Sequence, residues 1–321
     1  MKPWLKGAIS IALLALIFIL LPWNQVRDAL GRLPAYVWAG VLTGFVVGHG
    51  VGVFKWRLFV NAARAGLSAV DAVLCYSAGL FANLCLPSIV GGDILRMGLV
   101  TKITRRPAAA LWGGVMDRIT DMLALAILVT AGGLFARNSV KGWIGQALTV
   151  ALVVGFGLLF LMLPLLLRRP LVRWPRKLRR PVGRGLVGLR QLARRPGTAV
   201  LGLLLSITVQ GTFVLLNAWL GRTIGINVGL AVWFLVWPLA KIASLMPISL
   251  GGLAVREASL AALLLPFGVP VAVSVVCSLL WQTVLIAGGL FGGLIWLVLH
   301  RSRHVSFRAA NGQVVVLTEG E

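Results

Sequence analysis

The sequence predicts an all-α, polytopic membrane helical bundle, with about six full spans plus two broken re-entrant helical hairpins related as inverted repeats. Of the 321 residues, 59% are hydrophobic and only 12% are charged, whereas soluble domains contain about 45–50% apolar and about 25% charged residues. The net charge is +23, and the basic residues lie in short segments between long apolar runs, as in membrane proteins. This pattern excludes a soluble enzyme and argues against nucleic acid as a partner.

Apolar runs of about 20 residues are long enough to cross the hydrocarbon core of a bilayer. The first run follows a basic N-terminus and has no small-residue cleavage site, so we interpret it as an uncleaved signal anchor. We expect one transmembrane domain over residues 1–300, with repeat halves at about 1–134 and 143–300, and a short cytoplasmic tail at 301–321. The predicted full spans are at about 5–22, 36–54, 108–134, 143–167, 197–220 and 268–299.

The arginine-rich stretch at 168–196 sets the expected orientation, because positively charged loops remain in the cytoplasm. Counting spans outward from it places Lys55 in a cytoplasmic loop and both termini in the cytoplasm. We therefore expect a multi-pass protein of the cell inner membrane. Leucine and valine residues recur in this stretch at roughly helical spacing. Two interpretations remain open, an interfacial helix on anionic lipid or a topogenic anchor alone.

Two further apolar segments, at about 68–101 and 228–265, are interrupted by the same motif. Residues 86–96 read LPSIVGGDILR and residues 246–256 read MPISLGGLAVR, and both fit P-x3-GG-x3-R. Three full spans separate the copies, so the second is inverted, as in transporters with interrupted helices. Each motif predicts a re-entrant apex with free N–H groups suited to a phosphate or carboxylate; the alternative is two ordinary helix kinks. The predicted apex residues are Pro87, Gly91, Gly92, Pro247, Gly251 and Gly252.

Charged residues within apolar segments are candidate site residues, because each costs roughly 2.5–3.5 kcal/mol to insert at a helix centre. Asp93 lies one helical turn from Arg96, while Asp117 and Asp121 share a helix face. Such charges either bind substrate or pair with one another as structural ions. We expect Asp71 at a helix start or at the membrane interface. The predicted substrate-binding residues are Asp93, Arg96, Arg118, Asp121, Arg256 and Glu257.

The three cysteines and three histidines are scattered, without the spacing of a disulfide framework or a metal site. The sequence therefore predicts no catalytic residue, no metal and no cofactor. The glycine pairs at 288–289 and 292–293 predict close helix packing.

Three segments resemble the motifs of the lysylphosphatidylglycerol synthase transmembrane-region family, also called flippase-like: LPSIVGGDILR, MDRITD at 116–121 and MPISLGGLAVRE at 246–257. The resemblance covers about residues 5–300. It implies a membrane module that moves aminoacylated or other lipids between leaflets, without the soluble domain that performs aminoacyl transfer in the large synthases. Two residues depart from the family pattern. Asp117 stands where Glu is expected, and Ala254 stands where a third glycine is common.

We therefore expect an inner-membrane lipid translocation protein that is not an enzyme, with anionic membrane lipids as its partners. Arg96 and Arg256 are expected to bind a lipid phosphate from the two apices, with Asp93 and Glu257 orienting them or carrying protons. The sequence contains no ATP-binding loop, so the movement is downhill or uses an ion gradient. The alternative is a non-transporting membrane partner that anchors a lipid-modifying enzyme through the basic stretch.

Overall fold

The computed structural model describes residues 24, 27–28, 31–85, 91–136, 196–245 and 254–310, with side chains up to residue 301. This part of the chain consists of helices and connecting turns and contains no strand. Two predicted spans, 5–22 and 143–167, and nearly all of the basic stretch lie outside it. Four helices are long and apolar enough to cross a membrane, and each matches a predicted span: α3 (Ala35–Ala62), α6 (Pro107–Ala136), α9 (Pro196–Thr223) and α12 (Val271–Ala310).

Each predicted broken segment forms a pair of shorter helices. α4 (Ala69–Cys85) packs against α5 (Gly91–Thr104), and α10 (Leu230–Ser244) packs against α11 (Val255–Leu264), which a 3-10 turn η4 (Leu265–Phe267) follows. Even α4, the longest of these, is only about 25 Å long at 1.5 Å per residue, whereas the hydrocarbon core is about 30 Å thick. None of the four therefore spans a bilayer alone.

The predicted apex residues fall mostly between these short helices. Gly91 and Gly92 open α5. The other four lie in segments outside the described residues: Pro87, Pro247, Gly251 and Gly252.

Local sequence signals set where several helices begin. At the start of α4, the Asp71 N–H donates to Ser68 Oγ (3.1 Å) and the Ser68 hydroxyl donates to Asp71 Oδ2 (2.6 Å), as in a capping box. Asp71 thus lies at a helix start, as predicted. Pro107 and Pro196 occupy the first positions of α6 and α9, where the missing N–H costs no hydrogen bond.

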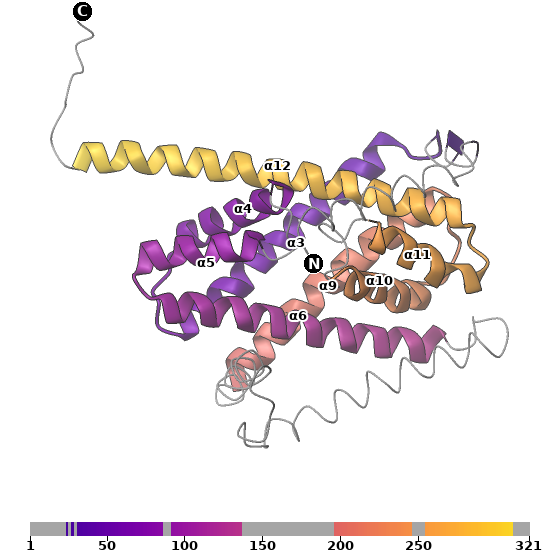
Figure 1. Cartoon of the computed structure of the whole chain (residues 1–321), viewed down its shortest axis with the longest axis horizontal. Coiled ribbons are helices and arrows are strands. Elements are labelled where there is room, and N and C mark those ends of the chain that lie inside the picture. Colours follow the sequence, from indigo (N-terminus) through magenta and orange to yellow (C-terminus); the bar gives the residue numbers. More distant parts are fainter. Residues whose placement is uncertain are drawn as a thin grey trace, which may run out of the picture.

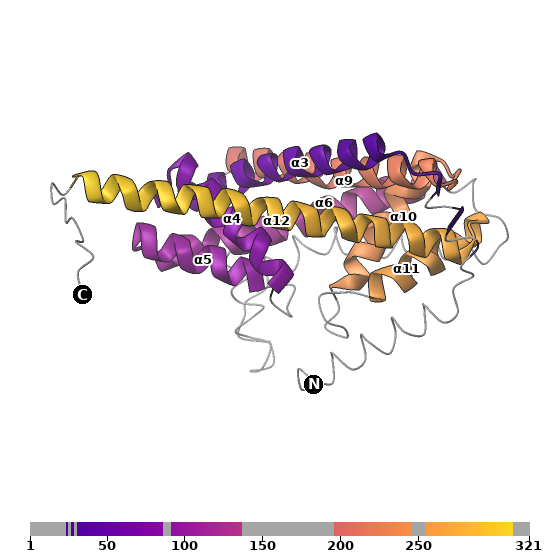
Figure 2. The same cartoon turned by 90° about the horizontal axis from the view of Figure 1, so that it is seen from above.

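The order of helix lengths is repeated along the chain. α3 to α6 run long, short, short, long, and α9 to α12 repeat that order. The α4–α5 pair occupies one end of the molecule and the α10–α11 pair the opposite end (Figures 1 and 2). Each pair packs against the last long helix of the other set, α4 against α12 and α10 against α6. The two sets of helices are therefore interlocked.

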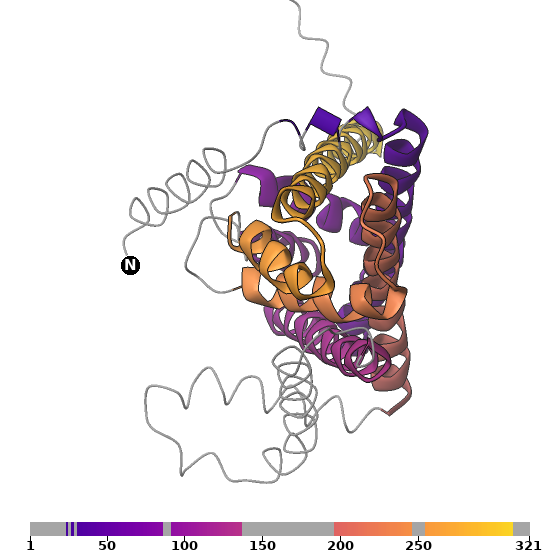
Figure 3. The same cartoon turned by 90° about the vertical axis from the view of Figure 1, so that its right-hand side faces the viewer.

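α3 and α9 lie side by side and form one wall of the bundle (Figure 3). Glycines of α3 make this close approach possible. A Cβ atom at Gly44 would lie 2.6 Å from the Leu216 side chain, and one at Gly48 would lie 2.8 Å from Phe213. Large side chains of α9 therefore fill the space that these glycines leave. Glycines of α12 contact side chains of α3 and α4 in the same way, as predicted: Gly288, Gly289 and Gly293.

The outer surface of the long helices is apolar. Tyr36 on α3 and Phe135 on α6, for example, are 73% and 79% exposed. Contiguous exposed hydrophobic side chains on helices of this length are typical of contact with lipid.

The prediction that Lys55 lies in a cytoplasmic loop is wrong. α3 continues to Ala62 rather than ending near residue 54, and the Lys55 side chain is buried inside the bundle, with 2% of the residue exposed. The hydrophobic sequence resumes after Lys55, so the helix continues. The ammonium is tolerated there because carboxylates from α6 surround it.

Ala254, the residue before α11, has φ +67° and ψ −37°, a region that an L side chain enters only at a cost of roughly 1–2 kcal/mol. We expect the Ala254→Gly variant to be more stable than Ala261→Gly, within α11, by at least about 1–2 kcal/mol. Both changes remove a buried methyl group, but only Ala254→Gly removes the backbone strain of a side chain at positive φ. Thermal unfolding in detergent measures the difference, and equal losses of stability would contradict this account.

Candidate functional site

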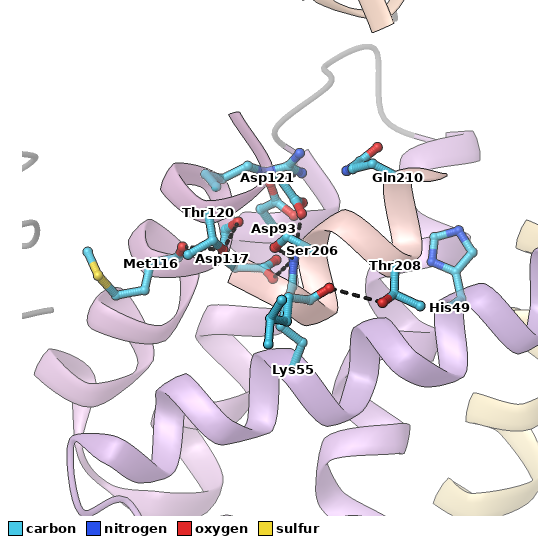
Figure 4. Close-up of polar contacts among 12 residues, drawn as sticks. His49, Lys55, Asp93, Met116, Asp117, Thr120, Asp121, Ser206, Thr208 and Gln210 are labelled. Atoms are coloured by element: carbon cyan, nitrogen blue, oxygen red, sulfur yellow. Dashed lines mark hydrogen bonds and ion pairs between the residues drawn. The ribbon is translucent and has the colours of Figure 1, made fainter. Parts of the chain in front are cut away.

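Lys55 of α3 is the centre of a buried charge cluster. Its Nζ lies 2.9 Å from Asp117 Oδ1 and 2.5 Å from Asp121 Oδ1, and it donates to Ser206 Oγ of α9 at 3.0 Å. Figure 4 shows the Lys55 side chain pointing toward these groups. Asp117 and Asp121 do share one face of α6, as the sequence predicted, and that face is turned toward a cation of another helix.

Arg96 of α5 is held by the same cluster. Its Nη2 lies 2.6 Å from Asp117 Oδ2 and 3.2 Å from Asp93 Oδ1, which confirms the predicted proximity of Asp93 and Arg96. The guanidinium carbon also lies 5.0 Å from the centre of the Trp56 ring and 5.2 Å from that of Tyr76. Asp117 therefore bridges two buried cations, and Arg96 is enclosed by carboxylates and aromatic rings.

Arg118 of α6 turns to α5 rather than to Asp121 on its own helix. Its Nε donates to Asp93 Oδ2 at 2.6 Å, and its Nη2 also contacts that oxygen. The Arg118 side chain is 43% exposed, unlike the enclosed Arg96 and Lys55. It therefore retains N–H donors that a ligand can reach.

Lys241 of α10 lines the same space, and its direct contacts are with neutral groups. Its Nζ donates to Gln210 Oε1 of α9 at 2.7 Å and lies 5.5 Å from the centre of the Phe213 ring. Within the described residues no carboxylate forms an ion pair with it. Nearby, His49 Nδ1 and Tyr76 Oη lie 3.2 Å apart.

These residues line one polar space of about 120 Å³, which we call the charged cavity. α3, α4, α5, α6, α9 and α10 all contribute to it. Among its described lining residues, four carry a positive charge and three a negative charge, so one positive charge is left over. The charged lining residues are Lys55, Arg96, Arg118, Lys241, Asp93, Asp117 and Asp121.

The first predicted apex is built around a close contact of two helices. The Gly92 N–H at the start of α5 donates to Asn83 Oδ1 of α4 at 2.9 Å. A Cβ atom at Gly92 would lie 2.1 Å from the Gly79 carbonyl oxygen. This N–H group, which the sequence suggested for a ligand, is therefore occupied by a side chain of the hairpin itself.

Arg256 and Glu257 of α11 form a separate buried cluster. Arg256 Nη2 lies 2.8 Å from Glu257 Oε1 and donates to Gln282 Oε1 of α12 at 2.9 Å, while Arg256 Nε donates to Ser278 Oγ at 3.0 Å. Neither residue lines the charged cavity. The structure thus brings together Asp93, Arg96, Arg118 and Asp121 but not the predicted residues of the second motif.

The buried clusters around Arg96 and Arg256 are arranged in the same way. Arg96 on α5 bonds to Asp117 on the following long helix, and Arg256 on α11 bonds to Ser278 and Gln282 on the following long helix. The arginine that ends each motif therefore ties the second short helix to the long helix after it.

A profile of the lysylphosphatidylglycerol synthase transmembrane region matches residues 4–293. The match covers most of the chain and every described helix, apart from the end of α12. This protein belongs to that family. Comparisons with curated proteins and with solved structures find no match.

Membership of the lysylphosphatidylglycerol synthase transmembrane-region family, together with the four long apolar helices, identifies a multi-pass membrane protein. The matched profile is that of the membrane region, not of the catalytic domain of such synthases. In the described part of the chain, no group of three or more His, Cys, Asp or Glu side chains is placed to hold a metal ion.

Several polar residues that line the charged cavity are not among the substrate-binding residues predicted from the sequence. His49, Lys55 and Gln210 each lie within a long apolar helix, and Lys241 lies within a short one. The available signal for Lys55 was the hydrophobic sequence that continues after it. The partners of such residues come from segments far apart in the chain, and a single sequence does not show which segments are in contact.

Proposed function

We propose that this protein moves an anionic phospholipid, or a modified lipid, between the leaflets of the inner membrane. The observation that carries the proposal is the charged cavity, a polar space with one excess positive charge inside a largely apolar bundle. Buried charges in a membrane protein are costly, so they are typically found on substrate or ion pathways. A lipid phosphate would neutralise the excess charge while the acyl chains stay in apolar surroundings.

Some of the cavity residues bind the phosphate, and others hold the helices together. Lys241 and Arg118 are the phosphate-binding groups, because Lys241 has no carboxylate partner among the described residues and Arg118 is partly exposed. Arg96 and Lys55 are held by Asp117 and keep the helices in register. Asp93 orients Arg118. Arginine and lysine both bind phosphate by charge-assisted hydrogen bonds.

The proposed architecture is one transmembrane domain over residues 1–300, with six spans and two re-entrant hairpins related as inverted repeats. The repeated order of helix lengths, the placement of the hairpins at opposite ends and the parallel roles of Arg96 and Arg256 support it. Interrupted helices of this kind frame midplane sites in many transporters. By the positive-inside rule, both termini are cytoplasmic.

Transbilayer movement of labelled anionic and aminoacylated lipids in liposomes tests the proposal. We expect Lys241→Gln to lower the initial rate by at least about tenfold, because a hydrogen bond to a charged group contributes about 1.5–3 kcal/mol. Lys102→Gln, on the exposed side of α5, is the matched control and is expected to leave the rate unchanged. Asp93→Asn and Arg96→Ala should also abolish movement.

Two outcomes would contradict the proposal. Movement that persists at the wild-type rate in Lys241→Gln and Arg118→Gln would remove the cavity from the mechanism. No movement above that of empty liposomes, with a folded protein, would favour the non-transporting partner of a lipid-modifying enzyme.

A further inference from the structure

A second, larger hollow lies beside the charged cavity, between α3, α4 and α12. It has a volume of about 260 Å³ and its surface is almost entirely carbon. We call it the apolar groove. Side chains that line it include Phe45, Val46, Val53, Leu80, Phe291 and Ile295.

The apolar groove and the charged cavity share a wall. His49, Tyr76 and Leu80 line both spaces, and His49 Nδ1 lies 3.2 Å from Tyr76 Oη within that wall. A molecule with a charged head and an apolar tail could therefore place each part in the matching space.

The apolar groove also reaches the surface that faces lipid. Phe54 of α3 and Phe291 of α12 line it, and both are exposed hydrophobic side chains. Arg57 lines it as well, with its Nε donating to the Leu67 carbonyl oxygen at 2.9 Å. A chain can therefore enter the groove sideways from the bilayer without crossing a polar surface.

We propose that the apolar groove holds one acyl chain of the same phospholipid whose phosphate occupies the charged cavity. This inference rests on the proposed function, because it takes the lipid as the ligand of the charged cavity. Two features favour an acyl chain over another occupant: the groove shares a wall with a cavity that has excess positive charge, and its lining is almost entirely carbon.

The groove would determine where the acyl chain lies, but it would not supply a hydrophobic driving force for binding it. A bilayer is as apolar as the groove, so an acyl chain gains little hydrophobic free energy on entering it. The groove instead lets the phosphate move inward without withdrawing the chain into polar surroundings, where each exposed CH₂ group would cost free energy. Blocking the groove should therefore change where the chain lies and how fast the lipid moves.

Gly50 offers a way to fill the groove without disturbing the bundle. It lines the groove on α3, and a Cβ atom there would meet nothing within 4 Å. Gly211 on α9 has equally open surroundings but lies outside the groove lining. Gly50→Phe and Gly211→Phe are thus a matched pair of variants, and both are expected to fold.

The test uses liposomes that contain phosphatidylglycerol with a diazirine at the end of one acyl chain. After illumination, mass spectrometry locates the labelled peptides. We expect label concentrated on α3 near Val46 and Val53 and on α12 near Phe291 and Ile295. Gly50→Phe should lose this label and slow transbilayer movement, whereas Gly211→Phe should retain both.

The outcomes separate this inference from the proposed function. Transbilayer movement without enriched groove label, or with label undiminished in Gly50→Phe, overturns the groove and leaves translocation standing. Groove label that Gly50→Phe removes, in a protein that moves no lipid, supports the groove and overturns translocation. A groove protected from label in every variant also overturns the inference.

Discussion

Replacing Asp117 by asparagine is expected to lower the free energy of unfolding by about 3–5 kcal/mol, the usual cost of removing one partner from a buried ion pair. Asp117 contacts two buried cations, Lys55 at 2.9 Å and Arg96 at 2.6 Å. Asparagine has nearly the same shape but no charge, so both cations lose their shared partner inside a membrane bundle. Reversible unfolding in mixed micelles, followed by circular dichroism, measures the change.

Asp121→Asn is the matched control for this prediction. Asp121 lies one turn away on the same helix, contacts Lys55 alone among the described cations and is more exposed than Asp117. We expect a clearly smaller loss of stability. Equal effects of the two asparagine variants would show that Asp117 does not bridge the cations.

Gly92→Ala is expected to have a second large effect, because it separates the two helices of the first hairpin. The added methyl group would lie 2.1 Å from the Gly79 carbonyl oxygen and 2.5 Å from Asn83 Oδ1. No side-chain adjustment relieves the first contact, because the Gly79 oxygen belongs to the backbone, and moving the Asn83 side chain away would break its hydrogen bond to the Gly92 N–H. We expect a loss of about 3 kcal/mol, at the upper end of overpacking costs, and loss of lipid movement.

The control for this variant lies on the same helix. Gly98 has nothing within 4 Å of a Cβ position, so Gly98→Ala adds the same methyl group without a clash. It is expected to match or exceed wild-type stability, because alanine is the better helix former by about 1 kcal/mol. Thermal unfolding of the two variants in parallel gives the comparison. A Gly92→Ala protein as stable as Gly98→Ala would mean that α4 and α5 do not touch there.

Much of the fold could be predicted from local patterns. Four predicted spans match helices that are long enough to cross a membrane, and the two interrupted segments form pairs of short helices. Length and continuity of an apolar run depend only on neighbouring residues, so the sequence is sufficient there. The Asp93–Arg96 pair was predictable for the same reason, since both residues lie within one turn of one helix.

The candidate site was predictable only in part. The sequence identified the charges of α5 and α6 but not their partners: Arg118 pairs with Asp93 on another helix, and Lys55 was assigned to a loop. These pairings join residues far apart in the chain, so helical spacing does not reveal them. Lys241 likewise meets Gln210 only through the packing of α10 on α9.

The interlocked packing of the two helix sets limits how the protein can move. Because α4 packs against α12 and α10 packs against α6, rotating one set as a rigid body against the other would pull both short helices from their supports. The glycine contacts between α3 and α9 add a third attachment. A rocking motion of two halves is therefore disfavoured, and under the proposed function we expect access to the charged cavity to change through small sliding or tilting movements of the short helix pairs within a fixed frame of long helices.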